Sequence, residues 1–129
     1  GVNKLLYFRS PNIKQQMANR YETVFILTPV LSEDQAKEAV NKYRDFIKSN
    51  GGEIMHEENW GLKKLAYQIQ KKSTGFYHLI EFEAPGEMVN PFELEFKRDE
   101  RVLRFLTVKL DKYGIAYVES RRNKTKAKA

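Results

Sequence analysis

The order of apolar and polar residues predicts a strand followed by a helix in the first half of the chain. Residues 21–27 are rich in β-branched and aromatic side chains, and Pro29 closes this run. Ser32, with Gln35 three residues later, has the pattern of a helix-capping box. Apolar residues then recur at helical spacing at Ala36, Val40, Tyr43 and Ile47. We expect this helix to end at the Gly51–Gly52 pair.

A β-hairpin is predicted next. Residues 53–70 form an extended region in which Gly61 is expected to produce a bend or bulge. Residues 71–75 are expected to form the turn. One face of a third strand, paired with the second, is then expected to carry Phe76, His78, Ile80 and Phe82, and the other face Tyr77, Leu79, Glu81 and Glu83.

A second helix and a fourth strand complete the pattern. Val89, Phe92 and Phe96 are spaced for one face of a helix, and Pro91 is tolerated only in its first turn. Two starts remain open: Asn90 as a cap with Glu93 completing a capping box, or an earlier start near Glu87. Residues 102–110 are predicted to be a strand with apolar side chains on both faces.

The predicted order of strand, helix, strand, strand, helix, strand is that of the α+β ferredoxin-like fold, βαββαβ. Right-handed crossovers place both helices on one face of a four-stranded antiparallel sheet. The other face has no helix to cover it, although the first, third and fourth strands carry apolar residues on both sides. That face is either a site for RNA or a protein partner, or is partly covered by the long second strand or the termini.

Charge is concentrated at the two ends of the chain. The formal net charge is +6, of which residues 1–20 contribute +4 and residues 114–129 another +4, so the body between them carries −2. We expect a flexible extension over residues 1–18, a folded domain over residues 19–113 and a disordered basic tail over residues 114–129. The tails are then the main source of nonspecific attraction to phosphate, although basic ends also serve solubility alone.

Catalytic chemistry has no support in the sequence. The chain has no cysteine, which excludes disulfides and thiolate metal sites. Its two histidines, His56 and His78, lie in predicted strands outside any recognisable motif, where a packed or surface histidine is more common than a ligand or base. No phosphate loop, nucleophile elbow or dinucleotide fingerprint occurs, and no apolar run has the length of a membrane span. We therefore expect no enzyme activity, no cofactor or metal, no membrane insertion and a cytoplasmic location.

Three segments carry a resemblance to the bacterial small-subunit ribosomal protein six family. Arg20-Tyr21-Glu22 opens the first strand as in family members. Residues 60–71, Trp-Gly-Leu-Lys-Lys-Leu-Ala-Tyr-Gln-Ile-Gln-Lys, resemble the family signature in which a glycine precedes basic residues and then Leu-Ala-Tyr. Gln68 departs from it, because the family usually has proline there. Residues 95–105 resemble the family's junction between the second helix and the last strand.

This resemblance implies a structural component of the ribosome with no small-molecule substrate. Its expected partners are the central domain of small-subunit rRNA and ribosomal protein eighteen. A near-neutral body agrees with a main contact to a strongly basic protein, because acidic groups can then face that partner.

The candidate residues for RNA or partner contact follow from family position and from side-chain chemistry. Cations pair with phosphate and aromatic rings stack on unpaired bases, although about half of such cations are expected to be merely solvated, and Glu100 could pair with Arg104 or Lys97 inside the protein. For both tyrosines, a role in the core or at an interface is favoured over stacking on bases. The candidates are Arg20, Tyr21, Lys63, Lys64, Tyr67, Lys71, Lys72, Lys97, Arg98, Arg101 and Arg104.

Two alternative functions remain. Gly75-Phe76 with Leu79 partly matches the aromatic strand signature of an RNA-recognition motif, which binds single-stranded RNA on a similar fold, although Thr74 and Phe82 depart from it. The other alternative function is that of a ferredoxin-like regulatory domain that binds a small ligand. A pocket with convergent polar groups would favour the second alternative.

Overall fold

The computed structural model describes residues 18–110, and its elements follow in the predicted order. The predicted basic tail and all but the last residue of the predicted extension lie outside this range. The elements are β1 Asn19–Leu27, α3 Glu33–Ser49, β2 Glu53–Ile69, β3 Lys72–Ala84, the short 3-10 helix η1 Gly86–Met88, α4 Val89–Arg98 and β4 Val102–Leu110.

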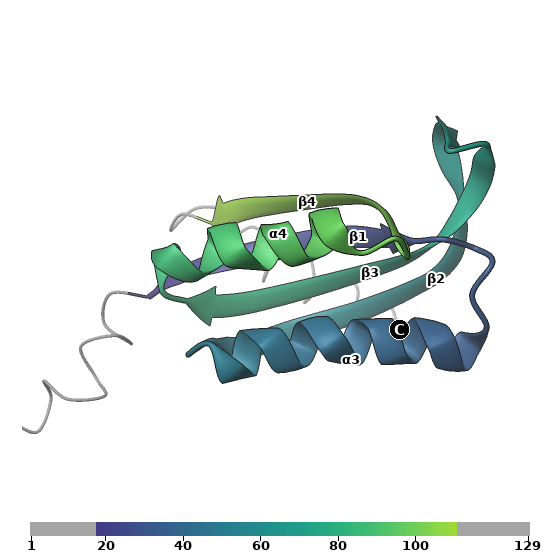
Figure 1. Ribbon diagram of the computed structural model, residues 1–129. Helices are drawn as coiled ribbons and strands as arrows, with labels where there is room; N and C mark the ends of the chain where they lie inside the picture. Colours follow the sequence, from purple (N-terminus) through teal and green to yellow (C-terminus); the bar gives the residue numbers. More distant parts are fainter. Residues whose placement is uncertain (1–17, 111–129) are drawn as a thin grey trace, which may run out of the picture.

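The four strands form one antiparallel sheet in the order β2-β3-β1-β4. Both helices lie on the same side of this sheet (Figure 1), as right-handed crossovers require. The predicted ferredoxin-like fold is therefore confirmed. We call the side that carries α3 and α4 the inner face, and the opposite side the outer face.

The predicted signals at both ends of α3 are confirmed. The Ser32 side chain accepts a hydrogen bond from the Gln35 backbone, and the Gln35 side chain accepts one from the Ser32 backbone. At the other end Asn50 is the C-cap, and Gly51 follows with a φ of +84°. Glycine suits this position because a side chain is strained in the left-handed region.

The turn of the hairpin differs from the prediction. β2 and β3 are joined by Gln70 and Lys71 alone, both with positive φ, and β3 already begins at Lys72. The prediction of a turn at residues 71–75 is therefore wrong. Two residues with positive φ match the twist of the strands, but the usual signal for such a turn is Asn-Gly, which Gln-Lys does not resemble.

α4 takes the earlier of the two predicted starts. It begins at Val89, directly after η1, and no side chain caps it. Pro91 is its third residue, where the missing N–H costs nothing because the first N–H groups of a helix have no partner within it. The bulge predicted at Gly61 is confirmed, because the register of β2 and β3 shifts there and the glycine has a φ of +73°.

The core lies between the inner face and the two helices. Its centre is an aromatic cluster in which the Tyr43 ring stacks on Phe96 at a centroid distance of 4.2 Å, and Phe25 contacts both rings at 5.3 and 5.1 Å. All three side chains are essentially inaccessible to solvent. Burial of each large apolar side chain stabilises the fold by roughly 1.5–3 kcal/mol, so this cluster fixes both helices on the sheet.

Candidate nucleic-acid and partner interface

The outer face combines an apolar strip with an exposed edge. Strand register places Leu79, Val24 and Leu106 side by side across β3, β1 and β4. Leu79 is buried, whereas Leu106 and Val108 at the β4 edge are 64% and 39% exposed. Large aliphatic side chains this exposed on a strand are typical of a surface that another macromolecule covers.

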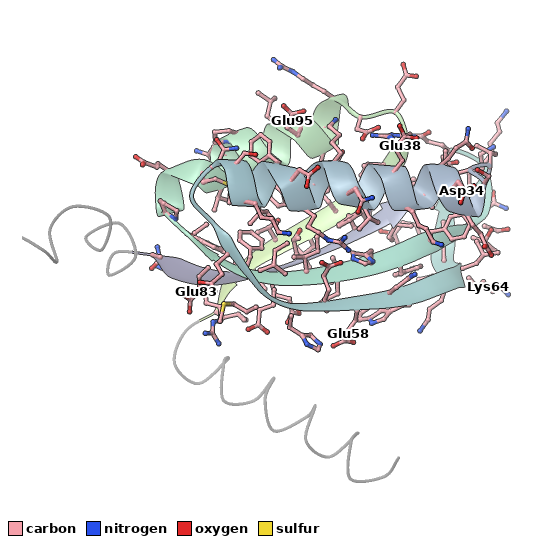
Figure 2. The ribbon with its side chains drawn as sticks, turned by 90° about the horizontal axis from the view of Figure 1, so that it is seen from below. Asp34, Glu38, Glu58, Lys64, Glu83 and Glu95 are labelled. Carbon is pink, nitrogen blue, oxygen red and sulfur yellow. The ribbon has the colours of Figure 1, made fainter. Side chains whose placement is uncertain are left out.

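The same face is acidic beyond that strip. Glu22 is level with Glu81 on β3, and Glu53 of β2 is level with Glu83. Figure 2 shows Glu58 and Glu83 on the side of the molecule away from α3. A group of carboxylates beside an apolar strip complements a partner that is basic.

Arg20 lies within this acidic region. Its guanidinium is 2.7 Å from the Glu83 carboxylate and 3.4 Å from that of Glu81, which is only 2% exposed. A buried carboxylate needs a cation or hydrogen-bond donors to remain charged. Arg20 therefore has an internal structural role, in which it holds Glu81 and Glu83.

Tyr21 faces the other way. It is buried on the inner face, and its ring lies 5.6 Å from that of Phe82. Of the two roles considered for this tyrosine, the structure shows the core role, and its ring is not available to stack on a base.

The hairpin extends beyond the sheet as a twisted arm, formed by the end of β2 and the start of β3 (Figure 1). Residues 59–75 contain Lys63, Lys64, Lys71 and Lys72 and no acid. At its base the Trp60 ring stacks on Tyr77 at 6.2 Å, with the Lys63 ammonium 5.3 Å from the Trp60 centroid. Lys64 lies at the end of the molecule in Figure 2. The arm therefore presents positive charge and aromatic surface together.

Three of the candidates are brought together at the tip of this arm. The Arg104 guanidinium lies 5.2 Å from the centroid of the Tyr67 ring and donates a hydrogen bond to its hydroxyl. Arg104 and Lys97 also line one hollow of about 400 Å³ with Gln70. Tyr67 and Arg104 are 37 positions apart in the sequence. They meet because the hairpin arm bends towards β4.

Arg101 has a different position, in the loop between α4 and β4. Its guanidinium and its backbone N–H both donate to Asp99, at 2.9 to 3.0 Å, and the Tyr43 hydroxyl donates to the same carboxylate at 2.6 Å. Burial alone raises the pKa of Asp99, but these hydrogen bonds outweigh burial and hold the pKa well below its ordinary value. Burial and the Asp99 carboxylate raise the pKa of Tyr43. Arg101 thus holds the loop between α4 and β4 in place. The sequence did not indicate this cluster of Tyr43, Asp99 and Arg101.

The sequence also did not indicate a second internal cluster, formed by Arg44, Glu57 and His78. The Arg44 guanidinium donates to both Glu57 oxygens, at 2.7 and 2.6 Å, and His78 contacts the same carboxylate at 2.7 Å. Burial lowers the pKa of His78, although Glu57 opposes this effect. The cluster joins α3 to the inner face of β2 and β3, so His78 is a packed histidine, as its sequence context favoured.

A hollow of about 920 Å³ lies beside this cluster, between α3 and the two strands of the hairpin. Its lining mixes apolar side chains with charged ones, and three of the charged groups, Arg44, Glu57 and His78, are bonded to one another. These three groups are therefore engaged within the protein and do not converge on a small ligand. Within residues 18–110, no group of three potential metal ligands occurs, and no helix is long and apolar enough to cross a membrane.

The comparisons with known proteins agree with this geometry. The family model for ribosomal protein S6 matches residues 20–109. The chain belongs to the ribosomal protein S6 family. One relative, small ribosomal subunit protein bS6 of Christiangramia forsetii, is 60% identical over 86% of this chain and 99% of its own length. The bS6 protein of Phocaeicola vulgatus is 63% identical over 81% of this chain and 92% of its own.

A solved structure supports the fold. The crystal structure of 30S ribosomal protein S6 from Thermotoga maritima matches with a TM-score of 0.70 at 24% sequence identity, covering 87% of this chain and 99% of that one. Family membership confirms the resemblance found in the sequence, and makes this chain a small-subunit ribosomal protein rather than an enzyme, located at the ribosome in the cytoplasm.

Proposed function

We propose that this chain is a structural constituent of the small ribosomal subunit that binds the central domain of small-subunit rRNA together with ribosomal protein eighteen. The observation that carries the proposal is the division of its surface. Exposed apolar and acidic groups lie on the outer face, whereas the hairpin arm and the α4–β4 junction carry a group of cations that take part in no ion pair among the described residues.

The outer face is assigned to the protein partner. Leu106 and Val108 provide apolar area at the β4 edge, and Glu22, which lies opposite Val108 and takes part in no ion pair among the described residues, complements a basic protein. Apolar surface supplies most of the free energy of such contacts, while opposite charges fix the orientation of the two proteins and speed their encounter.

The hairpin arm and the α4–β4 junction are assigned to RNA. Among the described residues, no ion pair involves Lys63, Lys64, Lys71, Lys72, Lys97, Arg98 or Arg104. Arg101 and Arg20 differ, because each has a carboxylate within 2.9 Å. A cation without an internal partner binds phosphate without first breaking an ion pair, so we expect the first group to make the phosphate contacts.

The RNA-recognition-motif alternative is less well supported. That mode needs exposed rings on the outer face of the central strands. Phe76 instead packs against the core from the inner face, and Phe82 is fully buried there. The partial sequence match at Gly75-Phe76 therefore does not correspond to a stacking surface.

The test replaces one side chain on the outer face. We expect Leu106→Lys to weaken binding of ribosomal protein eighteen about tenfold or more, because it removes apolar contact and adds a like charge opposite a basic partner. Val30→Lys is the matched control, since Val30 is 70% exposed but lies between β1 and α3. Calorimetric titration of the full chain measures both. Equal affinities would contradict the assignment of the outer face.

A further inference from the structure

The hollow of about 400 Å³ is formed by three segments that are distant in sequence. Gln70 comes from the turn of the hairpin arm, Phe96 and Lys97 from the end of α4, and residues 102–105 from the start of β4. Its volume lies within the range of about 300–1,000 Å³ that is typical of sites for single small molecules or groups. The site is therefore large enough for one chemical group of a larger ligand.

An exposed ring lies next to this hollow. Tyr67 is 59% exposed, and Arg104, which lines the hollow, contacts that ring. The phenol accepts a hydrogen bond from one terminal nitrogen of Arg104, which leaves the other guanidinium N–H groups for a ligand. Tyr67 and Arg104 thus present a flat aromatic surface and a cation side by side.

Nearby carboxylates do not neutralise these cations. Asp99 is held by Tyr43 and Arg101. The ion pair considered between Glu100 and Arg104 or Lys97 is not among the ion pairs of the described residues. Lys97 and Arg104 are both exposed, so the hollow favours an anionic ligand.

We propose that this hollow holds one nucleotide of an unpaired rRNA segment, with its phosphate bound by Lys97 and Arg104 and its base stacked on Tyr67. The combination of ring and cations favours RNA over an acidic peptide, because a base offers a flat π surface beside each phosphate. The acid-free arm that leads to the hollow favours the same ligand. The inference rests on the proposed function and identifies where a nucleotide is bound.

The stacking contact is tested with two variants of one residue. The affinity of the full chain for central-domain rRNA is measured in the presence of ribosomal protein eighteen. Tyr67→Leu should weaken binding about tenfold, because base–aromatic stacking contributes about 1–3 kcal/mol per base. Tyr67→Phe keeps the ring and should bind within about twofold of the unmodified chain. Equal binding by the two variants would overturn the stacking contact.

The phosphate contact is tested by salt dependence. Lys97→Gln and Arg104→Gln should each reduce the log–log salt slope by about 0.7, the value for one phosphate of a single strand. Lys37→Gln is the control, because Lys37 is an exposed lysine of α3. An unchanged slope in both test variants would overturn the site.

Two further outcomes separate this inference from the proposed function. If the unmodified chain fails to bind the RNA even with its partner, the proposed function fails, and this inference with it. If the unmodified chain binds but the variants weaken the contact with protein eighteen in the absence of RNA, the hollow is a protein contact and only this inference is overturned.

Discussion

The Tyr43 hydroxyl of α3 donates a 2.6 Å hydrogen bond to the carboxylate of Asp99, the residue that caps the C-terminus of α4. Asp99 in turn accepts from Arg101. This chain of contacts ties one helix to the end of the other and positions the loop that leads into β4. The conformation of the α4–β4 junction, where several candidate cations lie, therefore depends on a buried phenol.

Removal of this hydroxyl should destabilise the fold. Tyr43→Phe keeps the ring that stacks on Phe96 but loses a hydrogen bond to a charged group, which costs about 1.5–3 kcal/mol. Thermal and chemical unfolding measure the loss. Tyr67→Phe is the control, because its hydroxyl bonds to Arg104 at an exposed position, where water replaces the lost contact, and it should change stability by less than about 0.5 kcal/mol. A similar stability for the two variants would show that the Asp99 contact is unimportant.

The low pKa of Asp99 makes part of the stability depend on pH. Because the folded pKa lies below the unfolded value, ionised Asp99 stabilises the fold above about pH 4, and this stabilisation is lost as the pH falls through the folded pKa. We expect the difference in unfolding free energy between the unmodified chain and Asp99→Asn to be largest near neutral pH and to shrink below about pH 4. Urea denaturation at several pH values measures it. A difference that stays constant down to pH 2 would contradict the assigned cause.

Arg44 should control the protonation of His78. Burial lowers the pKa of His78, and the nearby positive charge of Arg44 lowers it further, while Glu57 raises it. Arg44→Met removes that charge and leaves Glu57 without its bidentate partner, so the pKa of His78 should rise. An NMR titration of the imidazole protons measures the change. Lys48→Met, which removes a charge from the last turn of the same helix, should leave His78 unaffected.

Gly75 permits close packing of the hairpin against β1. A Cβ atom at this position would lie 2.4 Å from the Ile26 side chain and 3.1 Å from the Leu27 carbonyl oxygen. Gly75→Ala should therefore cost about 1–3 kcal/mol of unfolding free energy through overpacking. At Gly86 the nearest atom is 3.4 Å away, so Gly86→Ala should be almost neutral. Equal melting temperatures for the two variants would contradict this packing argument.

The fold was largely predictable because its determinants are local. Strand alternation, helical spacing and the capping box at Ser32 each depend on residues that are close together in the chain. The hairpin turn was not predictable in this way, since the positive φ values at Gln70 and Lys71 are imposed by the pairing of the strands. Tertiary pairing overrode a weak local preference there.

The candidate site was only partly predictable. Residue type identified the cations, but whether a cation has an internal partner depends on contacts across the fold. Arg20 and Arg101 are held by carboxylates, whereas Lys97 and Arg104 line a hollow with the tip of the arm. The position of Tyr21 in the core follows from strand alternation, while the approach of Tyr67 to Arg104 depends on the curl of the hairpin arm, which no sequence pattern shows.

The most direct test of the account is the affinity of the full chain for central-domain rRNA, measured against salt concentration with and without ribosomal protein eighteen. We predict tight binding only when the partner is present, with a log–log slope of about −3.6 if four phosphates of double-helical rRNA are neutralised, at about −0.9 for each. Equally tight binding without the partner, or a slope near zero, would contradict the account.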